Sequence, residues 1–150
     1  MRSIKKFLIL TVVVWLGSIL STLQAQNDLQ ISKAFEQYGE RKGVVMVELT
    51  DEMLNGYDFS LFKSLTIKEN PSAADFIRKC LIKDEVGAKK VKQVVANGVS
   101  TSVYLQLPPK GQLYRLILFN ETFNPEKITL IYIESKNDSE DVLKLILKKK

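Results

Sequence analysis

The sequence contains no histidine, and this absence excludes more chemistry than the residues present supply. Without imidazole there is no Ser-His-Asp triad, no Cys-His nucleophile pair and no histidine-ligated zinc site. The sequence also lacks Gly-rich phosphate loops, EF-hand loops and nucleophile elbows. We therefore predict no catalytic residue, no cofactor and no metal ion.

Cysteine occurs once, at position 80, so an internal disulfide is excluded. A domain without disulfides depends on its apolar core for stability. Cys80 lies on the apolar side of a helix predicted over 72–86. No histidine or helix N-terminus is near it to lower the thiol pKa, which predicts a buried, inert cysteine.

The numbers of positive and negative charges are nearly balanced. The chain has 22 basic and 17 acidic residues, but three of the basic ones fall within the first six positions. Along the rest of the chain the signs are mixed, which is typical of a solvated surface. A nucleic-acid-binding protein would carry a basic stripe, so we expect no nucleic-acid partner.

The one long hydrophobic run stands at the N-terminus. The basic head of residues 1–6 precedes an apolar stretch from Phe7 to Leu20, and Ala25 offers a small residue for cleavage. This pattern predicts a secretory signal peptide over 1–25. The run falls short of the roughly 20 residues that a membrane span needs. We expect cleavage after Ala25, which gives an exported periplasmic or secreted protein that begins near Gln26. We expect no membrane span after cleavage. Because no cysteine lies near the cleavage site, we also expect that the protein is not a lipoprotein.

Residues 26–150 predict a single α+β domain. We expect a mostly antiparallel sheet of about five or six strands, including a C-terminal four-strand meander, packed with about three helices. Caps are assigned to Asp28 for the first helix and Ser72 for the second, and Thr50 is expected to begin a short additional helix. Residues 57–63 fit no pattern. The strands are expected at 44–49, 64–68, 91–96, 99–107, 112–119 and 128–134, and the last helix after 137–139.

The turns of the meander predict its register. Asn97-Gly98 is a strong hairpin signal that pairs Ala96 with Val99. A four-residue loop over 108–111 would pair Leu107 with Gln112, and we place Phe119 opposite Lys127. Strict alternation then predicts one core face. That face carries Val99, Thr101, Val103, Leu105, Tyr114, Leu116, Leu118, Ile128, Leu130 and Tyr132.

In this register the opposite face is apolar as well, although a solvated sheet face would be polar. Two interpretations remain open: the chain's own helices divide between both faces or the sheet curls, or the second face binds a partner. The candidate binding residues on this second face are Tyr104, Leu113, Arg115, Ile117, Phe119, Ile131 and Ile133, next to Val91 and Val95.

The order of elements, with the segment Tyr38 to Met53 and the final strand through Ile131-Tyr132-Ile133, resembles a family of small exported Bacteroidota proteins of unknown function. The resemblance covers nearly the whole chain after the leader. It implies export to a Gram-negative envelope, and it implies no activity and no site residues.

Three hypotheses of function follow. The first is a non-enzymatic envelope domain that binds a protein, peptide or lipid through the second sheet face. The second is a carboxylate-dependent hydrolase, with or without an oxygen-ligated divalent cation, which two acids facing each other across a cleft would favour. The third is an accessory subunit that oligomerises through the apolar face; the sequence leaves the oligomeric state open.

Overall fold

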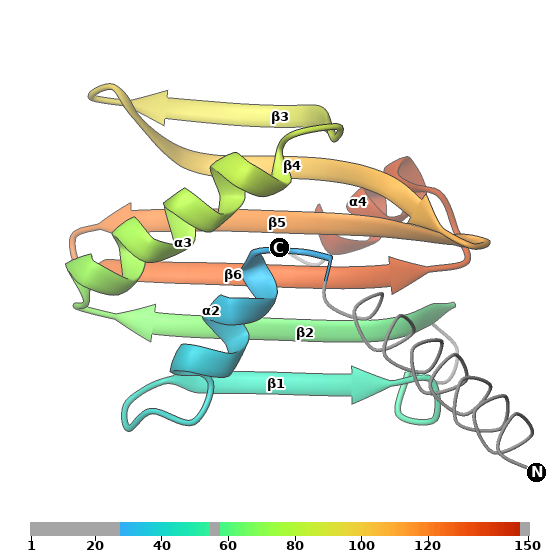
Figure 1. Cartoon of the computed structure of the whole chain (residues 1–150), viewed down its shortest axis with the longest axis horizontal. Coiled ribbons are helices and arrows are strands. Elements are labelled where there is room, and N and C mark those ends of the chain that lie inside the picture. Colours follow the sequence, from blue (N-terminus) through green and yellow to red (C-terminus); the bar gives the residue numbers. More distant parts are fainter. Residues whose placement is uncertain (1–27, 55–57, 148–150) are drawn as a thin grey trace, which may run out of the picture.

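The computed structural model describes residues 28–54 and 58–147, which form a six-stranded antiparallel sheet with helices on both faces (Figure 1). The predicted α+β class is confirmed, whereas the predicted signal peptide lies outside the described residues. The strand order is β1-β2-β6-β5-β4-β3. The elements are α2 (Ile31–Tyr38), β1 (Val45–Thr50), β2 (Phe59–Lys68), α3 (Pro71–Asp84), β3 (Lys89–Ala96), β4 (Val99–Lys110), β5 (Leu113–Phe123), β6 (Glu126–Ser135) and α4 (Ser139–Leu147).

The three described helices divide between the two faces of the sheet. Figure 1 shows α2 and α3 in front of the sheet and α4 behind it. The front core joins α2 and α3 to fully buried strand residues such as Leu65, Leu105 and Phe119. The rear core joins α4 to Leu116 and Ile133. Of the two interpretations of a two-sided apolar sheet, the one in which the chain covers itself on both faces is therefore confirmed. None of the helices in the described part of the chain is both long and apolar enough to cross a membrane.

The first two described helices form where the sequence predicts them, but with different caps. Asn70, not Ser72, precedes α3 and accepts a hydrogen bond from the Ala73 N–H at 3.0 Å, with Pro71 at the first helical position. Residues 51–54 form a turn closed on the Thr50 carbonyl instead of the predicted short helix. The predicted cap at Ser72 and the predicted helix start at Thr50 are therefore both wrong.

The register of β5 differs from the prediction. The Asn97-Gly98 turn does pair Ala96 with Val99. At the next turn, however, β4 runs on to Lys110, and a bulge separates the pair Leu107–Arg115 from the pair Lys110–Leu113. The expected long loop is replaced by two residues, which moves β5 by three positions relative to β4. An odd shift turns every β5 side chain to the other face.

The same error recurs at the next turn. β5 and β6 extend to the pair Phe123–Glu126, so Phe119 lies opposite Leu130 rather than Lys127. This second three-residue shift cancels the first for β6. The predicted placement of Val103 on β4 and Leu130 on β6 on the same face is therefore right, and the faces of β5 are exchanged.

Candidate functional site

The seven residues predicted to form one apolar binding face do not share a face. Cross-strand partners lie on the same side of a sheet, and Ile117 pairs with Leu105 and Phe119 with Val103, on the side of α2 and α3. Arg115 follows the same alternation, and Leu113 begins β5 opposite Lys110. Tyr104, Ile131 and Ile133 point to the α4 side instead.

Most of these residues are also covered. Ile117, Phe119 and Ile133 are fully buried in the two cores. Tyr104 and Ile131 are half-buried, and the Lys92 ammonium lies 5.7 Å from the centre of the Tyr104 ring. The predicted apolar face is therefore corrected to two separate sets of core residues, because β5 presents its other side.

A different set of side chains gathers at one end of the α2 side of the sheet. Polar and charged residues occupy positions there that are in phase with the core. Lys63 lies two residues before Leu65 on β2, and Tyr132 and Glu134 lie two and four residues after Leu130 on β6. Lys63 lies opposite both Glu48 and Tyr132, so three neighbouring strands contribute to one row. In the next row, Glu134 lies opposite Arg115.

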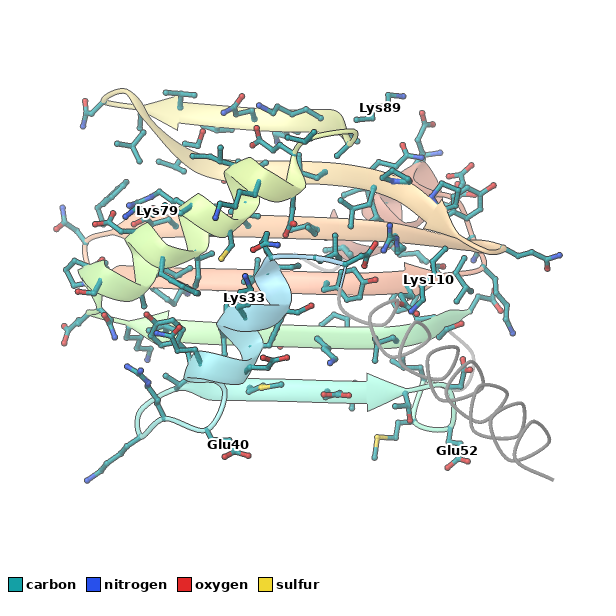
Figure 2. The ribbon with its side chains drawn as sticks, viewed as in Figure 1. Lys33, Glu40, Glu52, Lys79, Lys89 and Lys110 are labelled. Atoms are coloured by element: carbon teal, nitrogen blue, oxygen red, sulfur yellow. The ribbon has the colours of Figure 1, made fainter. Side chains whose placement is uncertain are left out.

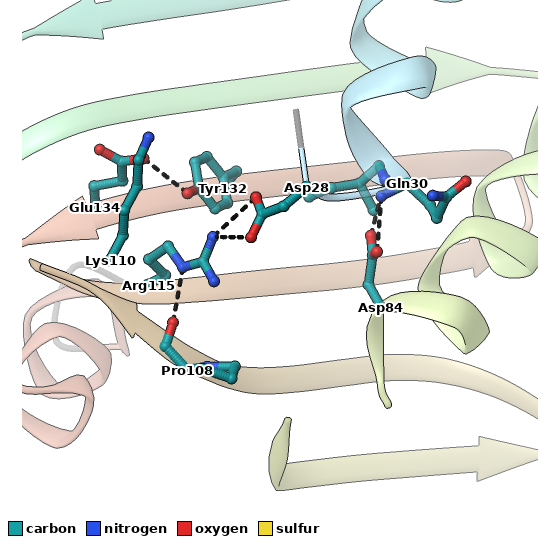
Figure 3. A network of polar contacts seen from close by, with 9 residues as sticks. Asp28, Gln30, Asp84, Pro108, Lys110, Arg115, Tyr132 and Glu134 are labelled. Atoms are coloured by element: carbon teal, nitrogen blue, oxygen red, sulfur yellow. Dashed lines mark hydrogen bonds and ion pairs between the residues drawn. The ribbon is translucent and has the colours of Figure 1, made fainter. Parts of the chain in front are cut away.

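Arg115 is the buried centre of this end of the sheet, with 6% of its surface exposed (Figure 3). Its Nε donates to the Pro108 carbonyl at 2.8 Å, and its Nη1 donates to both carboxylate oxygens of Asp28 at 2.8 and 3.1 Å. Burial lowers the pKa of the guanidinium, but Asp28 and, to a lesser extent, Tyr132 together outweigh that effect and leave the pKa raised. Arg115 is therefore a fixed cation, and it holds the chain just before α2 against the sheet.

Asp28 is bound to Arg115, so the prediction that it caps α2 is wrong. The cap is supplied by Asp84, at the end of α3. The Gln30 and Ile31 N–H groups donate to the two carboxylate oxygens of Asp84, at 2.7 and 2.8 Å (Figure 3). Asp84 ends α3, so one side chain both caps α2 and ties the two helices together. A carboxylate there also opposes the positive end of the helix dipole.

Two further acids at this end, Glu48 and Glu134, have a lysine or a phenol as partner. Glu48 Oε2 lies 3.4 Å from the Lys63 Nζ. Glu134 Oε1 accepts from the Tyr132 hydroxyl at 2.8 Å and lies 3.8 Å from the Lys110 Nζ. Burial, followed by the hydrogen bond and charge of Glu134, raises the pKa of Tyr132, so this phenol stays protonated as a donor.

These groups line an open pocket of about 360 Å³ between α2 and strands β1, β2 and β6, which we call the α2–β1 pocket. Its lining combines an apolar wall from α2, β1 and β2 with the charged row described above. Figure 2 shows Glu40 beyond the end of α2 and Lys110 at the other end of the site. The lining residues are Asp28, Leu29, Ile31, Ser32, Phe35, Glu36, Glu40, Met46, Glu48, Leu61, Lys63, Lys110, Tyr132 and Glu134.

The pocket carries an excess of negative charge. Five of its lining residues are carboxylates and two are lysines. Asp28 is neutralised by Arg115, which leaves Glu36, Glu40, Glu48 and Glu134 facing two ammonium groups. The chain as a whole is net positive, with a formal charge of +5. The excess of negative charge at the pocket is therefore a local feature.

The two acids of the charged strands, Glu48 and Glu134, are both paired. A glycosidase-type mechanism needs one carboxylic acid and one carboxylate held on either side of the bond to be cleaved. Here Glu48 and Glu134 are each drawn to a lysine, and Glu134 to a phenol as well. Within 28–54 and 58–147, no group of three or more acidic or cysteine side chains is placed to hold a metal ion.

A second hollow of about 320 Å³ lies between α3 and the β3–β4 hairpin. Its lining is mainly apolar, and its charged groups are already paired: Arg78 with Glu121 and Asp75, and Glu85 with Lys90. Arg78 donates three hydrogen bonds to Glu121, whose side chain is almost wholly buried. The Arg78–Glu121 pair fastens α3 to β5, and every charged side chain of this lining has a partner of opposite charge.

Sequence reasoning missed the α2–β1 pocket, although a signal for it exists. Charged or phenolic residues stand at inward-facing positions near the ends of β1, β2, β5 and β6. A single charged residue at a core-facing position gives no information about a site. Several such residues close together on adjacent strands indicate a polar site. With the correct β5 register, Arg115 would have joined this set.

Comparison with protein families gives a match over most of the chain. A family of unknown function (DUF6108) covers residues 18–146. The chain belongs to this family. The predicted resemblance to a family of unknown function is thereby confirmed at that level, and the family supplies no activity for the pocket. A search of curated proteins found no match.

Proposed function

We propose that this chain is an exported, non-enzymatic binding domain, and that its ligand presents a positively charged group to the α2–β1 pocket. Export rests on the leader predicted over 1–25, and it places the domain in a Gram-negative envelope, as in the Bacteroidota proteins that the sequence resembles. The observation that carries the binding proposal is the charge of the pocket, where the four carboxylates not paired with Arg115 outnumber the two lysines.

The apolar half of the lining defines the rest of the ligand. Leu29, Met46 and Leu61 are partly exposed beside the charged row. Binding sites of this kind combine apolar walls with a few polar groups that fix orientation. A ligand that joins an apolar segment to an ammonium or guanidinium group uses both halves, whereas an anion would meet Glu48 and Glu134.

Three small probes of matched shape test the proposal. We expect 4-phenylbutylamine to bind and to shift the amide resonances of α2 and β1, whereas neutral 4-phenylbutanol binds more weakly and 4-phenylbutyrate leaves the spectrum unchanged. Exposed ion pairs contribute little, so Glu48→Gln should weaken amine binding by about two- to fivefold. The measurement is the dissociation constant from NMR titration at low ionic strength, where screening is weakest.

Glu140→Gln is the matched control. Glu140 is exposed on α4, behind the sheet, so the same loss of charge should leave amine binding unchanged. Equal affinity for the amine and the carboxylate, or an equal effect of the two variants, would contradict the proposed site.

A further inference from the structure

The two edges of the sheet differ in how they are protected. β3, at one edge, carries Lys89, Lys90 and Lys92, and its register shifts twice along β4. Lysines and bulges are the usual means by which an edge strand is kept from pairing with another chain. Figure 2 shows Lys89 at this edge.

β1, at the opposite edge, has neither device. Its six residues pair with β2 without a register shift, and the strand contains no lysine or proline. Within the described residues β2 is its single neighbour in the sheet. Alternate backbone N–H and C=O groups of β1 therefore face away from β2, in the geometry that an added strand needs.

The side chains of β1 define what that strand must carry. Met46 and Glu48 point to the α2 side and line the pocket. Val45 and Val47 point to the α4 side, with 62% and 36% of their surfaces exposed. An added strand with basic residues on one side and apolar residues on the other would place ammonium groups toward Glu48 and cover both valines.

We propose that β1 binds an extended peptide by strand addition, and that alternate basic side chains of the peptide enter the α2–β1 pocket. This inference rests on the proposed function and names its ligand class. The backbone pairing supplies affinity, while Glu48 supplies selectivity, since an acidic strand would be repelled at that position.

The probe is the peptide acetyl-Thr-Val-Lys-Val-Lys-Val-Thr-amide, labelled for fluorescence anisotropy. We expect it to bind at least tenfold more tightly than 4-phenylbutylamine and to be displaced by that amine. Replacing its lysines by glutamates should abolish binding. Methylating the backbone nitrogens of alternate residues should lower affinity by at least about 25-fold for one of the two alternating sets and little for the other. An edge strand donates from one side only, each set includes at least two donors, and each net hydrogen bond changes affinity about fivefold.

Matched edge variants locate the peptide on the protein. Val47→Lys should weaken binding at least tenfold, because it sets a charge against the apolar side of the added strand. Val94→Lys should have no effect, since Val94 is comparably exposed, at 42%, but lies on the β3 edge. Both variants change an exposed side chain, so both should fold, and circular dichroism verifies this.

The outcomes distinguish strand addition at β1 from cation binding in the α2–β1 pocket. If the amine binds but the peptide binds no more tightly and ignores N-methylation, strand addition is overturned and the cation site stands. If N-methylation matters but the amine neither binds nor competes, edge pairing stands and the pocket is overturned. If wild-type protein forms concentration-dependent oligomers that Val94→Lys and Val47→Lys both disrupt, the occupant of β1 is the β3 edge of a second copy, and the peptide proposal is overturned.

Discussion

Single side chains at the start of α2 show how remote residues replace local caps. Sequence proximity assigned the cap to Asp28, but the carboxylate that accepts from the first helical N–H groups belongs to Asp84, at the end of α3. Asp28 is instead bound to Arg115. Both acids lie near the helix N-terminus, and only the fold determines which one reaches it. A local capping rule cannot make that choice.

Asp84 also gives a prediction for the pH dependence of stability. Burial raises the pKa of this carboxyl above its ordinary value of 3.8, and the hydrogen bonds from Gln30 and Ile31 only partly offset the rise. Between the unfolded and folded pKa values the folded state therefore binds more protons than the unfolded state. The contribution of Asp84 to the free energy of unfolding should fall as pH rises from about 4 through the folded pKa.

The measurement is the free energy of unfolding of wild type and Asp84→Asn by urea titration across that pH range. The variant does not titrate at this position, so the difference, wild type minus variant, should decrease as pH increases. A difference that grows with pH would mean that the two N–H donors outweigh burial. Asp84→Ala removes the acceptor altogether and should cost about 1–2 kcal/mol, the usual effect of losing a helix cap.

Cys80 is a residue whose environment the sequence did predict. It is buried, with burial the first cause of its raised thiol pKa and the nearby Asp84 charge the second. Both effects disfavour the thiolate, which is the reactive form. The prediction succeeded because it needed only the helical periodicity around residue 80.

At the scale of elements, most helix and strand positions were predictable, whereas the first half of β2 and the register of β5 were not. Periodicity identified the buried residues of α2, namely Ile31, Ala34, Phe35 and Tyr38. Register depended on where Pro108 and Pro109 lie. They were assigned to a loop, yet they continue β4 past the last β3 pair, Lys89–Gln106, where no β3 partner needs their missing N–H groups.

The exchanged faces of β5 can be tested with one pair of substitutions. The sequence placed Ile117 and Ile131 on the same face, whereas they lie on opposite faces, Ile117 with no exposed surface and Ile131 half-buried. Ile117→Asp buries an unpaired carboxylate and should destabilise the fold by about 3–5 kcal/mol. Ile131→Asp should cost only about 1–2 kcal/mol, because its carboxylate can reach water.

Chemical denaturation of both variants gives the two free energies, and circular dichroism at low denaturant shows whether each is folded. Equal losses would contradict the assigned faces. A larger loss for Ile131→Asp would contradict them as well, since the register that the sequence predicted puts both residues on one face and would give similar losses.

At the scale of the whole molecule, the distribution of polar groups separates scaffold from site. The Arg78–Glu121 pair is enclosed by α3 and β5, and it fixes the scaffold. The charged row at the other end of the sheet opens to a pocket beside an unprotected strand edge. The sequence predicted both apolar faces and their covering by helices as one of two alternatives. It could not locate the pocket, because that site depends on the register of four strands.

The signal peptide predicted over 1–25 gives the last test, which concerns where the molecule functions. Expressed with its leader in a Gram-negative host, the chain should lose residues 1–25 and be recovered from the periplasm with an N-terminus near Gln26. Intact-mass spectrometry of the fractions measures this directly. Leu10→Arg interrupts the apolar run that the export machinery recognises, so it should retain the full-length chain in the cytosol. Cytosolic wild type that still begins at Met1 would exclude export, and with it an envelope ligand for the α2–β1 pocket.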